Sequence, residues 1–241
     1  MISRYLILYG VVAASLVAAA IRGRVPQDPN YHVFADRRTI LRIPNFWNVA
    51  SNLPFLVVGA AGLGTLETSK VDPALTASYL VFFLSLIGLS FGSAYYHLAP
   101  DNRRLTWDRL PMALAFMAFL VIVIGERIDT DLARPLLPLF LVTGAASVAW
   151  WHFSERGGRG DLRAYLLVQF LPLVLAALIV LLFPSTFAET RGIGGMLVAY
   201  VFAKVAEIYD ERIFVGGAIS GHTVKHLTAA AGVYCLVVGM P

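Results

Sequence analysis

The sequence predicts an all-α protein, a polytopic bundle of membrane-crossing helices. Three observations predict this class: 58% of the 241 residues are hydrophobic, only 14% are charged, and the mean hydropathy is +0.72. Soluble chains carry roughly 25% charged residues, so the charges here are too few to cover a water-facing surface. The composition therefore excludes a soluble enzyme, a disordered chain and a fibrous repeat.

Cysteine content and net charge exclude further classes. Cys235 is the single cysteine, so the chain has neither an internal disulfide nor the paired cysteines of a zinc ribbon or a thioredoxin-like site. The net charge is +4, but the basic residues are scattered singly and in pairs between apolar runs. Membrane topology explains this scatter better than a nucleic-acid partner does.

Apolar runs long enough to span a bilayer define the helices. A helix needs about 20 apolar residues to cross the hydrocarbon core, and backbone groups in lipid must be bonded within the segment. Long continuous runs are therefore expected to be helices, packed in one integral-membrane domain over residues 1–241. Eight runs have this length, at roughly 4–21, 46–66, 74–97, 108–125, 135–152, 163–183, 193–209 and 219–239.

The first run has two interpretations. Arg4, the apolar stretch and Ala18–Ala20 resemble a signal peptide, but cleavage would export the basic loop 22–44, so we favour a retained helix over residues 1–21.

Basic residues in the loops predict the orientation. Loops 22–44, 98–107, 153–162 and 210–218 hold most of the basic residues, which places these loops in the cytoplasm and both termini outside. A chain poor in lysine and rich in alanine, glycine and arginine looks bacterial, so we expect an inner-membrane location.

The run 46–66 begins with polar residues. Asn48 and Asn52 are four residues apart and therefore share a helix face. They either bond a neighbouring helix or line a cavity, and the general tendency of polar groups to bridge membrane helices favours the first.

Ionisable residues inside membrane spans are costly and by default mark a functional site. Each of these residues lies at the helix end that adjoins loop 98–107 or loop 210–218, so we expect them to meet at one membrane face, the cytoplasmic one. They are His97, Asp108, Lys204, Glu207, His222, Lys225 and His226.

Three of these residues are histidines. His222 and His226 are four residues apart, the spacing that presents two imidazoles on one helix face to a metal, and His97 supplies a third ligand. Three histidines with an open position are typical of catalytic zinc, although imidazole also suits copper, iron and nickel. Hydrogen-bonded core histidines are the alternative, less favoured for three at one depth.

Two further residues have both a catalytic and a structural interpretation. Ser93 shares the helix face of His97 and either assists an oxyanion or a water, or allows close helix packing. Asp108, at the expected helix start, acts as a general base on water or caps the helix. Lys204, Glu207 and Asp210 either orient a ligand histidine or simply form ion pairs.

The combined pattern resembles the alkaline ceramidases. Ser93-x3-His97 is followed by Asp108 eleven residues on and by His222-x3-His226 in the last helix. Short stretches around these residues are similar as well, and the similarity extends from about Asp28 to the end. These stretches are Asn45–Leu53, Gly92–His97 and Asp108–Met112.

The resemblance implies a seven-helix core over 45–241, with residues 1–21 as an extra helix. It also implies a zinc amidase that hydrolyses ceramide, a lipid substrate taken from the bilayer, to a sphingoid base and a fatty acid. By position, the zinc ligands of the family correspond to His97, His222 and His226. The acid–base residue corresponds to Asp108, and the residue that assists the oxyanion or the water corresponds to Ser93.

A calcium site is also implied by the resemblance, with Asp28 and Asn30 as candidate ligands. Val25 and Asn45, however, stand where the family has acidic residues, which argues against calcium.

Two rival functions stay open from the sequence. The first is hydrolysis of another acyl lipid, because many bacteria make no ceramide. The second is a non-enzymatic seven-helix receptor or metal carrier, which would leave Ser93 and Asp108 without a task. Nothing in the sequence identifies a protein partner.

Overall fold

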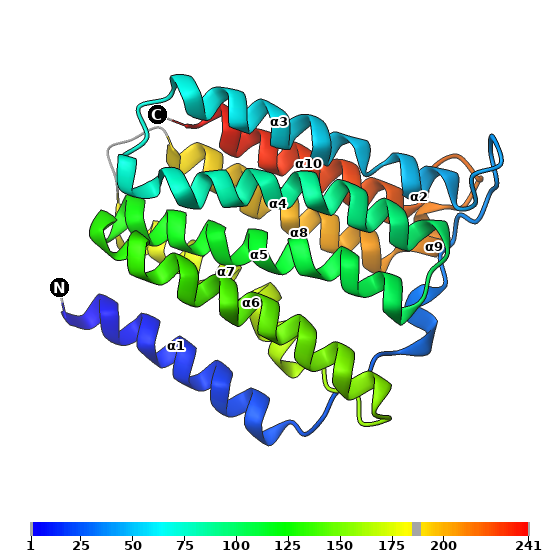
Figure 1. Ribbon diagram of the computed structural model, residues 1–241, viewed down its shortest axis with the longest axis horizontal. Coiled ribbons are helices and arrows are strands. Elements are labelled where there is room, and N and C mark those ends of the chain that lie inside the picture. The colour runs from blue at the N-terminus through cyan, green and yellow to red at the C-terminus, as the bar shows by residue number, and fades with distance from the viewer. Residues whose placement is uncertain (1, 185–188, 241) are drawn as a thin grey trace. The chain divides into compact units, whose positions relative to one another are not determined.

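The computed structural model describes residues 2–184 and 189–240, and this part of the chain is helical with no β-strand (Figure 1). The expected all-α class is confirmed. The helices are α1 (Ile2–Ile21), η1 (Pro29–His32), α2 (Phe46–Ala50), α3 (Leu53–Thr68), α4 (Pro73–Leu98), α5 (Asn102–Arg127), η2 (Thr130–Leu132), α6 (Ala133–Arg156), α7 (Arg163–Leu182), α8 (Glu189–Ile208), α9 (Asp210–Ile213) and α10 (Gly221–Val238).

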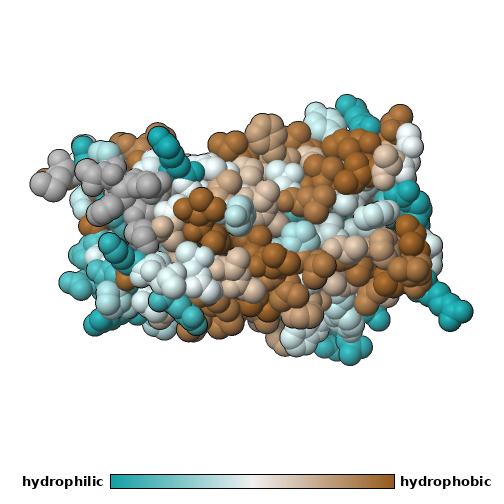
Figure 2. Space-filling view, turned by 90° about the horizontal axis from the view of Figure 1, so that it is seen from above, coloured by the Kyte–Doolittle hydropathy of each residue, from teal (hydrophilic) through white to brown (hydrophobic). Residues whose placement is uncertain are grey.

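All eight predicted runs are helical, and six described segments are long and apolar enough to cross a membrane. The helices α8 and α10 are not among these six; they contain the polar residues Lys204, Glu207, His222, Lys225 and His226. On the face drawn in Figure 2, apolar side chains predominate across the middle and hydrophilic side chains gather toward the two ends. The six segments are Ile2–Ile21, Phe46–Thr68, Pro73–Leu98, Asn102–Arg127, Thr130–Arg156 and Arg163–Leu182.

Two predicted helix boundaries were wrong. The helix expected to open at Asp108 begins at Asn102, so Asp108 lies inside α5. Asp101 caps this helix instead, because its carboxylate accepts the Arg104 backbone N–H at 2.6 Å. The run 46–66 is interrupted at Ser51, where the chain turns into α3 with Pro54 in the first helical turn, a position that tolerates the missing N–H of proline.

The described chain forms two compact units, and α4 and α5 contribute to both. The first unit comprises Met1–Asp28, Val71–Phe82 and Met112–Thr186; the second comprises Pro29–Lys70, Phe83–Pro111 and Phe187–Pro241. All five residues assigned to catalysis or zinc belong to the second unit.

In the first unit, α7 packs against α1 and α6. The Arg163 guanidinium joins the start of α7 to the end of α1, donating to the Ala19 carbonyl at 3.0 Å. The same guanidinium pairs with Asp161 at 2.8 Å. Asp161 is buried, and its backbone N–H donates to the Ser154 hydroxyl at 3.0 Å. The connector between α6 and α7 is thus held by an ion pair whose carboxylate is buried.

In the second unit, α10 packs against α8 and α3. Glycines bring α8 and α10 into close contact: a Cβ added at Gly232 would lie 2.6 Å from the Ala199 Cβ, and one at Gly221 would lie 2.1 Å from the Ala206 carbonyl oxygen. Small residues give membrane helices the close packing that hydrophobic burial cannot supply in lipid. These contacts fix the position of the first turn of α10, which contains His222.

The ion pair at Asp161 predicts a pH-dependent contribution to stability. Arg163 lowers the pKa of the Asp161 carboxyl to about 2, below its value of about 3.9 in an unfolded chain. A lowered carboxyl pKa stabilises the fold above about pH 4, and the contribution is lost as the pH falls toward 2. Asp161→Asn should therefore reduce the free energy of unfolding at pH 7 by about 1–3 kcal/mol.

Unfolding in detergent, followed from pH 7 down to pH 3, measures this difference between wild type and variant, which should shrink below pH 4. Asp131→Asn, at an exposed carboxylate, is the control. A difference that stays constant with pH would contradict the ion-pair account.

Candidate metal centre

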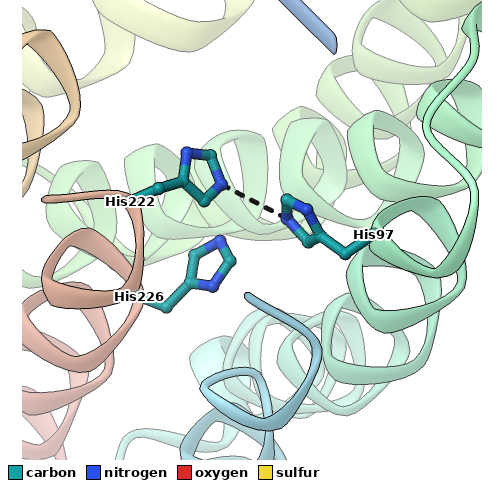
Figure 3. A group of neighbouring side chains, drawn as sticks. All are labelled: His97, His222 and His226. Carbon is teal, nitrogen blue, oxygen red and sulfur yellow. Dashed lines mark hydrogen bonds between the residues drawn. The ribbon is translucent and has the colours of Figure 1, made fainter. Parts of the chain in front are cut away.

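Three buried imidazoles meet at one place in the second unit. His97 comes from the last turn of α4, and His222 and His226 come from the first two turns of α10 (Figure 3). Each ring offers one nitrogen as a ligand, and these three nitrogens lie within 4.8 Å of one another. The ring centroids are 4.7–5.1 Å apart. The structure therefore brings together the three histidines that the sequence pattern selected.

The cluster has the chemistry of a metal site. The Nε2 atoms of His97 and His222 are 3.3 Å apart, roughly the separation of two nitrogens that bind one tetrahedral ion at about 2.0–2.1 Å. The Nδ1 atom of His97 is buried and has no hydrogen-bond partner in the described part of the chain. Since buried polar groups are normally hydrogen-bonded, hydrogen-bonded core histidines explain this cluster poorly. It is the one group of three or more such ligands among residues 2–184 and 189–240.

A serine in the helix break holds one of these rings. The Ser51 hydroxyl lies 2.8 Å from Nδ1 of His226, and both side chains are buried. A hydrogen bond to the second ring nitrogen fixes the orientation and tautomer of a metal-binding imidazole. The sequence analysis did not select Ser51. Its place between Asn48 and Asn52 in a polar stretch was the available signal.

Asn48 bridges helices, as the sequence predicted. Its side-chain oxygen accepts from the Thr223 hydroxyl at 3.2 Å, and its nitrogen donates to the Asp36 carbonyl at 3.1 Å. Asn52 donates to the Asn48 carbonyl at 2.7 Å. Asn48 thus joins α2 to α10 next to His222.

Ser93 and Asp108 form a buried pair beside the histidines. Ser93 precedes His97 by one helical turn, and its hydroxyl is a hydrogen-bond partner of the Asp108 carboxylate. Both residues are less than 10% exposed. Because Asp108 lies inside α5 and Asp101 caps the helix, the capping interpretation of Asp108 is wrong.

A glycine allows this pair to form. A Cβ added at Gly92 would lie 2.1 Å from the Trp107 carbonyl oxygen and 3.4 Å from the Asp108 backbone nitrogen. The backbones of α4 and α5 therefore touch at Gly92, immediately before Ser93. The two interpretations of Ser93 therefore apply to adjacent residues: Gly92 allows the close helix packing, and Ser93 bonds Asp108.

The segment after η1, which includes Phe34 and Ala35, covers the histidines. The Phe34 ring contacts the His97 and His222 rings, with centroid distances of 4.7 and 4.6 Å. Asp210 holds the segment in place, since its carboxylate accepts the Ala35 N–H at 2.9 Å and the His222 N–H at 2.7 Å. Phe34, which the sequence pattern did not select, therefore lies against two candidate ligands, and Asp210 bonds the backbone of one of them.

Further bonds fix both ends of this segment. His32 contacts the Tyr96 hydroxyl at 2.9 Å and Asn102 at 3.0 Å through its two ring nitrogens. The Arg38 guanidinium pairs with Asp36 at 2.6 Å, lowers the pKa of the Asp36 carboxyl, and donates to the carbonyls of residues 217 and 218. The sequence pattern indicated no role for His32. Its two contacts help to hold the segment that covers the histidines.

Glu207, near the end of α8, forms ion pairs. Glu207 accepts from Lys225 at 2.6 Å and also bonds Lys204. Of the two sequence interpretations of Glu207, the ion-pair interpretation matches these contacts.

Asp28 and Asn30, the candidate calcium ligands, flank Pro29 at the start of η1 and are both exposed. Asn45, which stands where the family has an acidic residue, donates its side-chain N–H to the His97 carbonyl at 2.9 Å. That amide therefore supports the helix turn that carries a candidate zinc ligand.

The fold and this site define a multi-pass membrane protein with a buried three-imidazole cluster of the kind that binds a metal ion. A protein-family model described as Ceramidase matches residues 39–241, and the chain belongs to this family. A comparison with curated proteins gave no match. The protein is accordingly an amidohydrolase that acts on ceramide-like amides, as the sequence resemblance indicated.

The close contact at Gly92 predicts a specific loss of activity. Gly92→Ala should force α4 and α5 apart and separate Ser93 from Asp108, which should slow amide hydrolysis roughly 10–100-fold, since misplacement of reacting groups by about 1 Å has such effects. Gly88→Ala is the matched control one turn earlier, where the new Cβ would meet the Pro111 Cβ at an ordinary 3.5 Å.

Initial rates and thermal unfolding, both in detergent, test this prediction. Equal rates in the two variants would show that the approach at Gly92 does not position the pair.

Proposed function

We propose that the protein is a zinc-dependent intramembrane hydrolase that cleaves the N-acyl amide bond of ceramide or a ceramide-like lipid. The products are a fatty acid and a free amine, the sphingoid base in the case of ceramide. The observation that supports this proposal is the position of the buried Ser93–Asp108 pair next to three convergent imidazoles in a chain of the ceramidase family.

In this proposal His97, His222 and His226 hold the zinc ion. The ion supplies Lewis acidity toward the amide carbonyl and toward water. Ser51 keeps the His226 ring oriented, and the Phe34 ring covers His97 and His222, which limits the access of bulk water to the site.

Asp108 is the proposed general base and acid. Its carboxylate takes a proton from the water that attacks the carbonyl carbon, and it returns that proton to the amine nitrogen as the C–N bond breaks. One water is consumed for each amide cleaved, so atoms and charges balance.

Ser93 is the proposed partner of the oxyanion. Its hydroxyl bonds the Asp108 carboxylate before reaction. Once Asp108 has accepted a proton, it is a weaker acceptor, and the hydroxyl is free to donate to the negative charge that develops on the carbonyl oxygen.

The site lies at helix ends rather than at helix centres, which suits the substrate. His97 is in the last turn of α4, and His222 is in the first turn of α10. The amide of a bilayer lipid lies near the headgroups, so a substrate can present its amide there while its acyl chain stays among apolar helices. We further propose a bacterial inner membrane with this end in the cytoplasm, on the loop charges. Calcium at Asp28 and Asn30 is not part of the proposal, because Val25 and Asn45 stand where the resemblance calls for acidic ligands.

Metal content tests the ligand assignment. Purified wild-type protein should hold about one zinc ion per chain, and His222→Ala or His226→Ala should hold little, because each removes one of three ligands. His152→Ala is the control, since His152 lies in α6, in the first unit. Elemental analysis after dialysis measures the ratio. Retention of zinc by both ligand variants would refute the assignment.

Asp108→Asn tests the acid–base role. The amide of asparagine cannot accept the proton, so hydrolysis of a ceramide should fall about 10²–10⁴-fold, while zinc content stays near one per chain. Asp101→Asn is the control, because asparagine caps helices as well as aspartate does.

The measurement is release of fatty acid from ceramide in detergent micelles, followed by mass spectrometry. Full activity in folded, zinc-loaded Asp108→Asn would rule out this mechanism.

A further inference from the structure

A tyrosine at the edge of the site has no part in the mechanism above. Tyr31 lies in η1, directly before His32. The two ring nitrogens of His32 contact the Tyr96 hydroxyl at 2.9 Å and the Asn102 side chain at 3.0 Å. The Tyr31 and His32 rings meet edge to face, with centroids 6.3 Å apart. Because His32 is held through both nitrogens, the turn that carries Tyr31 is held as well.

The Tyr31 ring also contacts the helix that carries the acid–base residue. The guanidinium carbon of Arg109 lies over this ring, 5.4 Å from its centroid. A cation in this position is attracted by the π electrons of the ring. Arg109 is buried and directly follows Asp108 in α5. The contact therefore keeps Tyr31 beside the turn of α5 that contains Asp108.

The hydroxyl is the inner end of the Tyr31 side chain. The residue as a whole is 36% exposed, yet burial raises the pKa of its phenol. The charges of Asp108, Lys225 and Glu207 act on the hydroxyl, together with that of Arg109. The hydroxyl therefore lies among the polar groups of the site rather than in bulk water.

This hydroxyl makes no hydrogen bond with the residues that the structure describes, 2–184 and 189–240. A buried tyrosine hydroxyl usually has a hydrogen-bond partner. The charged groups near it are already engaged with each other or with Ser93: Lys225 donates to Glu207 at 2.6 Å, and Asp108 bonds Ser93. A ligand bound at the site would supply the partner that the Tyr31 hydroxyl lacks.

The position of Tyr31 selects the part of the substrate that meets it. In the proposed mechanism Asp108 returns a proton to the amine nitrogen, and the Tyr31 hydroxyl lies within the field of that carboxylate. The turn η1 lies between the candidate membrane spans 2–21 and 46–68, in the connector before α2. The acyl chain stays among apolar helices, so the polar group close to the amine nitrogen is the part that reaches this connector.

We propose that the Tyr31 hydroxyl binds a hydroxyl group in the amine portion of the lipid, the primary hydroxyl in the case of ceramide, and thereby selects hydroxylated amines. The inference rests on the proposed hydrolase function and names a residue that determines its specificity. A phenol and an alcohol each donate and accept hydrogen bonds, so the two groups match. An alkyl group in place of the alcohol would leave the inward phenol unbonded, which costs binding energy.

Two lipids that differ by one oxygen provide the test. N-palmitoylsphingosine has a primary hydroxyl where N-palmitoyl-1-deoxysphingosine has a hydrogen. In detergent micelles, wild-type protein should cleave the first with a kcat/KM about three- to tenfold higher, the usual effect of one neutral hydrogen bond. Tyr31→Phe removes the oxygen and keeps the ring beside Arg109. It should lower kcat/KM for the hydroxylated lipid by a similar factor and leave that for the deoxy lipid unchanged.

Tyr95→Phe is the matched control. Tyr95 belongs to the same unit and is 41% exposed. The guanidinium carbon of Arg104 lies 5.4 Å from its ring centroid, the same distance as that between Arg109 and the Tyr31 ring. This variant loses the same oxygen atom from a similar setting and should keep the wild-type ratio of the two lipids. The ratio also cancels any difference in how the two lipids enter the micelles.

The outcomes separate this inference from the proposed function. An equal fall for both lipids in Tyr31→Phe would show that the hydroxyl positions the site without reading the substrate, and this overturns the inference. Unchanged rates in Tyr31→Phe overturn it as well. A wild-type protein that cleaves both lipids with equal kcat/KM overturns the inference and leaves the hydrolase intact. Failure of folded, zinc-loaded wild-type protein to cleave either lipid overturns the proposed function itself.

Discussion

The site depends on one constraint: polar groups placed between apolar helices must bond each other, because lipid offers them no partner. Ser51 bonds the His226 ring, and the bond between Asn48 and Thr223 joins α2 to the first turn of α10, which contains His222. Each of these bonds fixes a helix as well as a side chain. The same contacts that stabilise the second unit therefore also set the distances within the imidazole cluster.

The sequence predicted the helices and much of the site for a physical reason. Long apolar runs can only be helices in lipid, and the scarcity of charge made the few ionisable residues in spans conspicuous. The pairing of His222 with His226 followed from helical spacing, whereas the approach of His97 was expected from its place at the same end of its helix. Family resemblance then supplied roles for Asp108 and Ser93.

Other features were beyond the sequence pattern. The start of α5 at Asn102 was missed because Arg103 and Arg104 looked like a loop, although Asp101 supplies a cap. Ser51 was missed because its role depends on a helix break, which a hydropathy pattern does not show. Phe34 and His32 were missed because they lie in a loop whose path is set by long-range contacts with Tyr96, Asn102 and Asp210.

Asp210 links the cover of the site to its base. One of its oxygens holds the Ala35 backbone in the covering segment, and the other holds the His222 backbone at the start of α10. Displacement of the segment from above the rings releases one arm of this bridge and loosens the carboxylate that steadies the other. The covering segment and the first turn of α10, which contains a candidate metal ligand, are in this way joined through a single side chain.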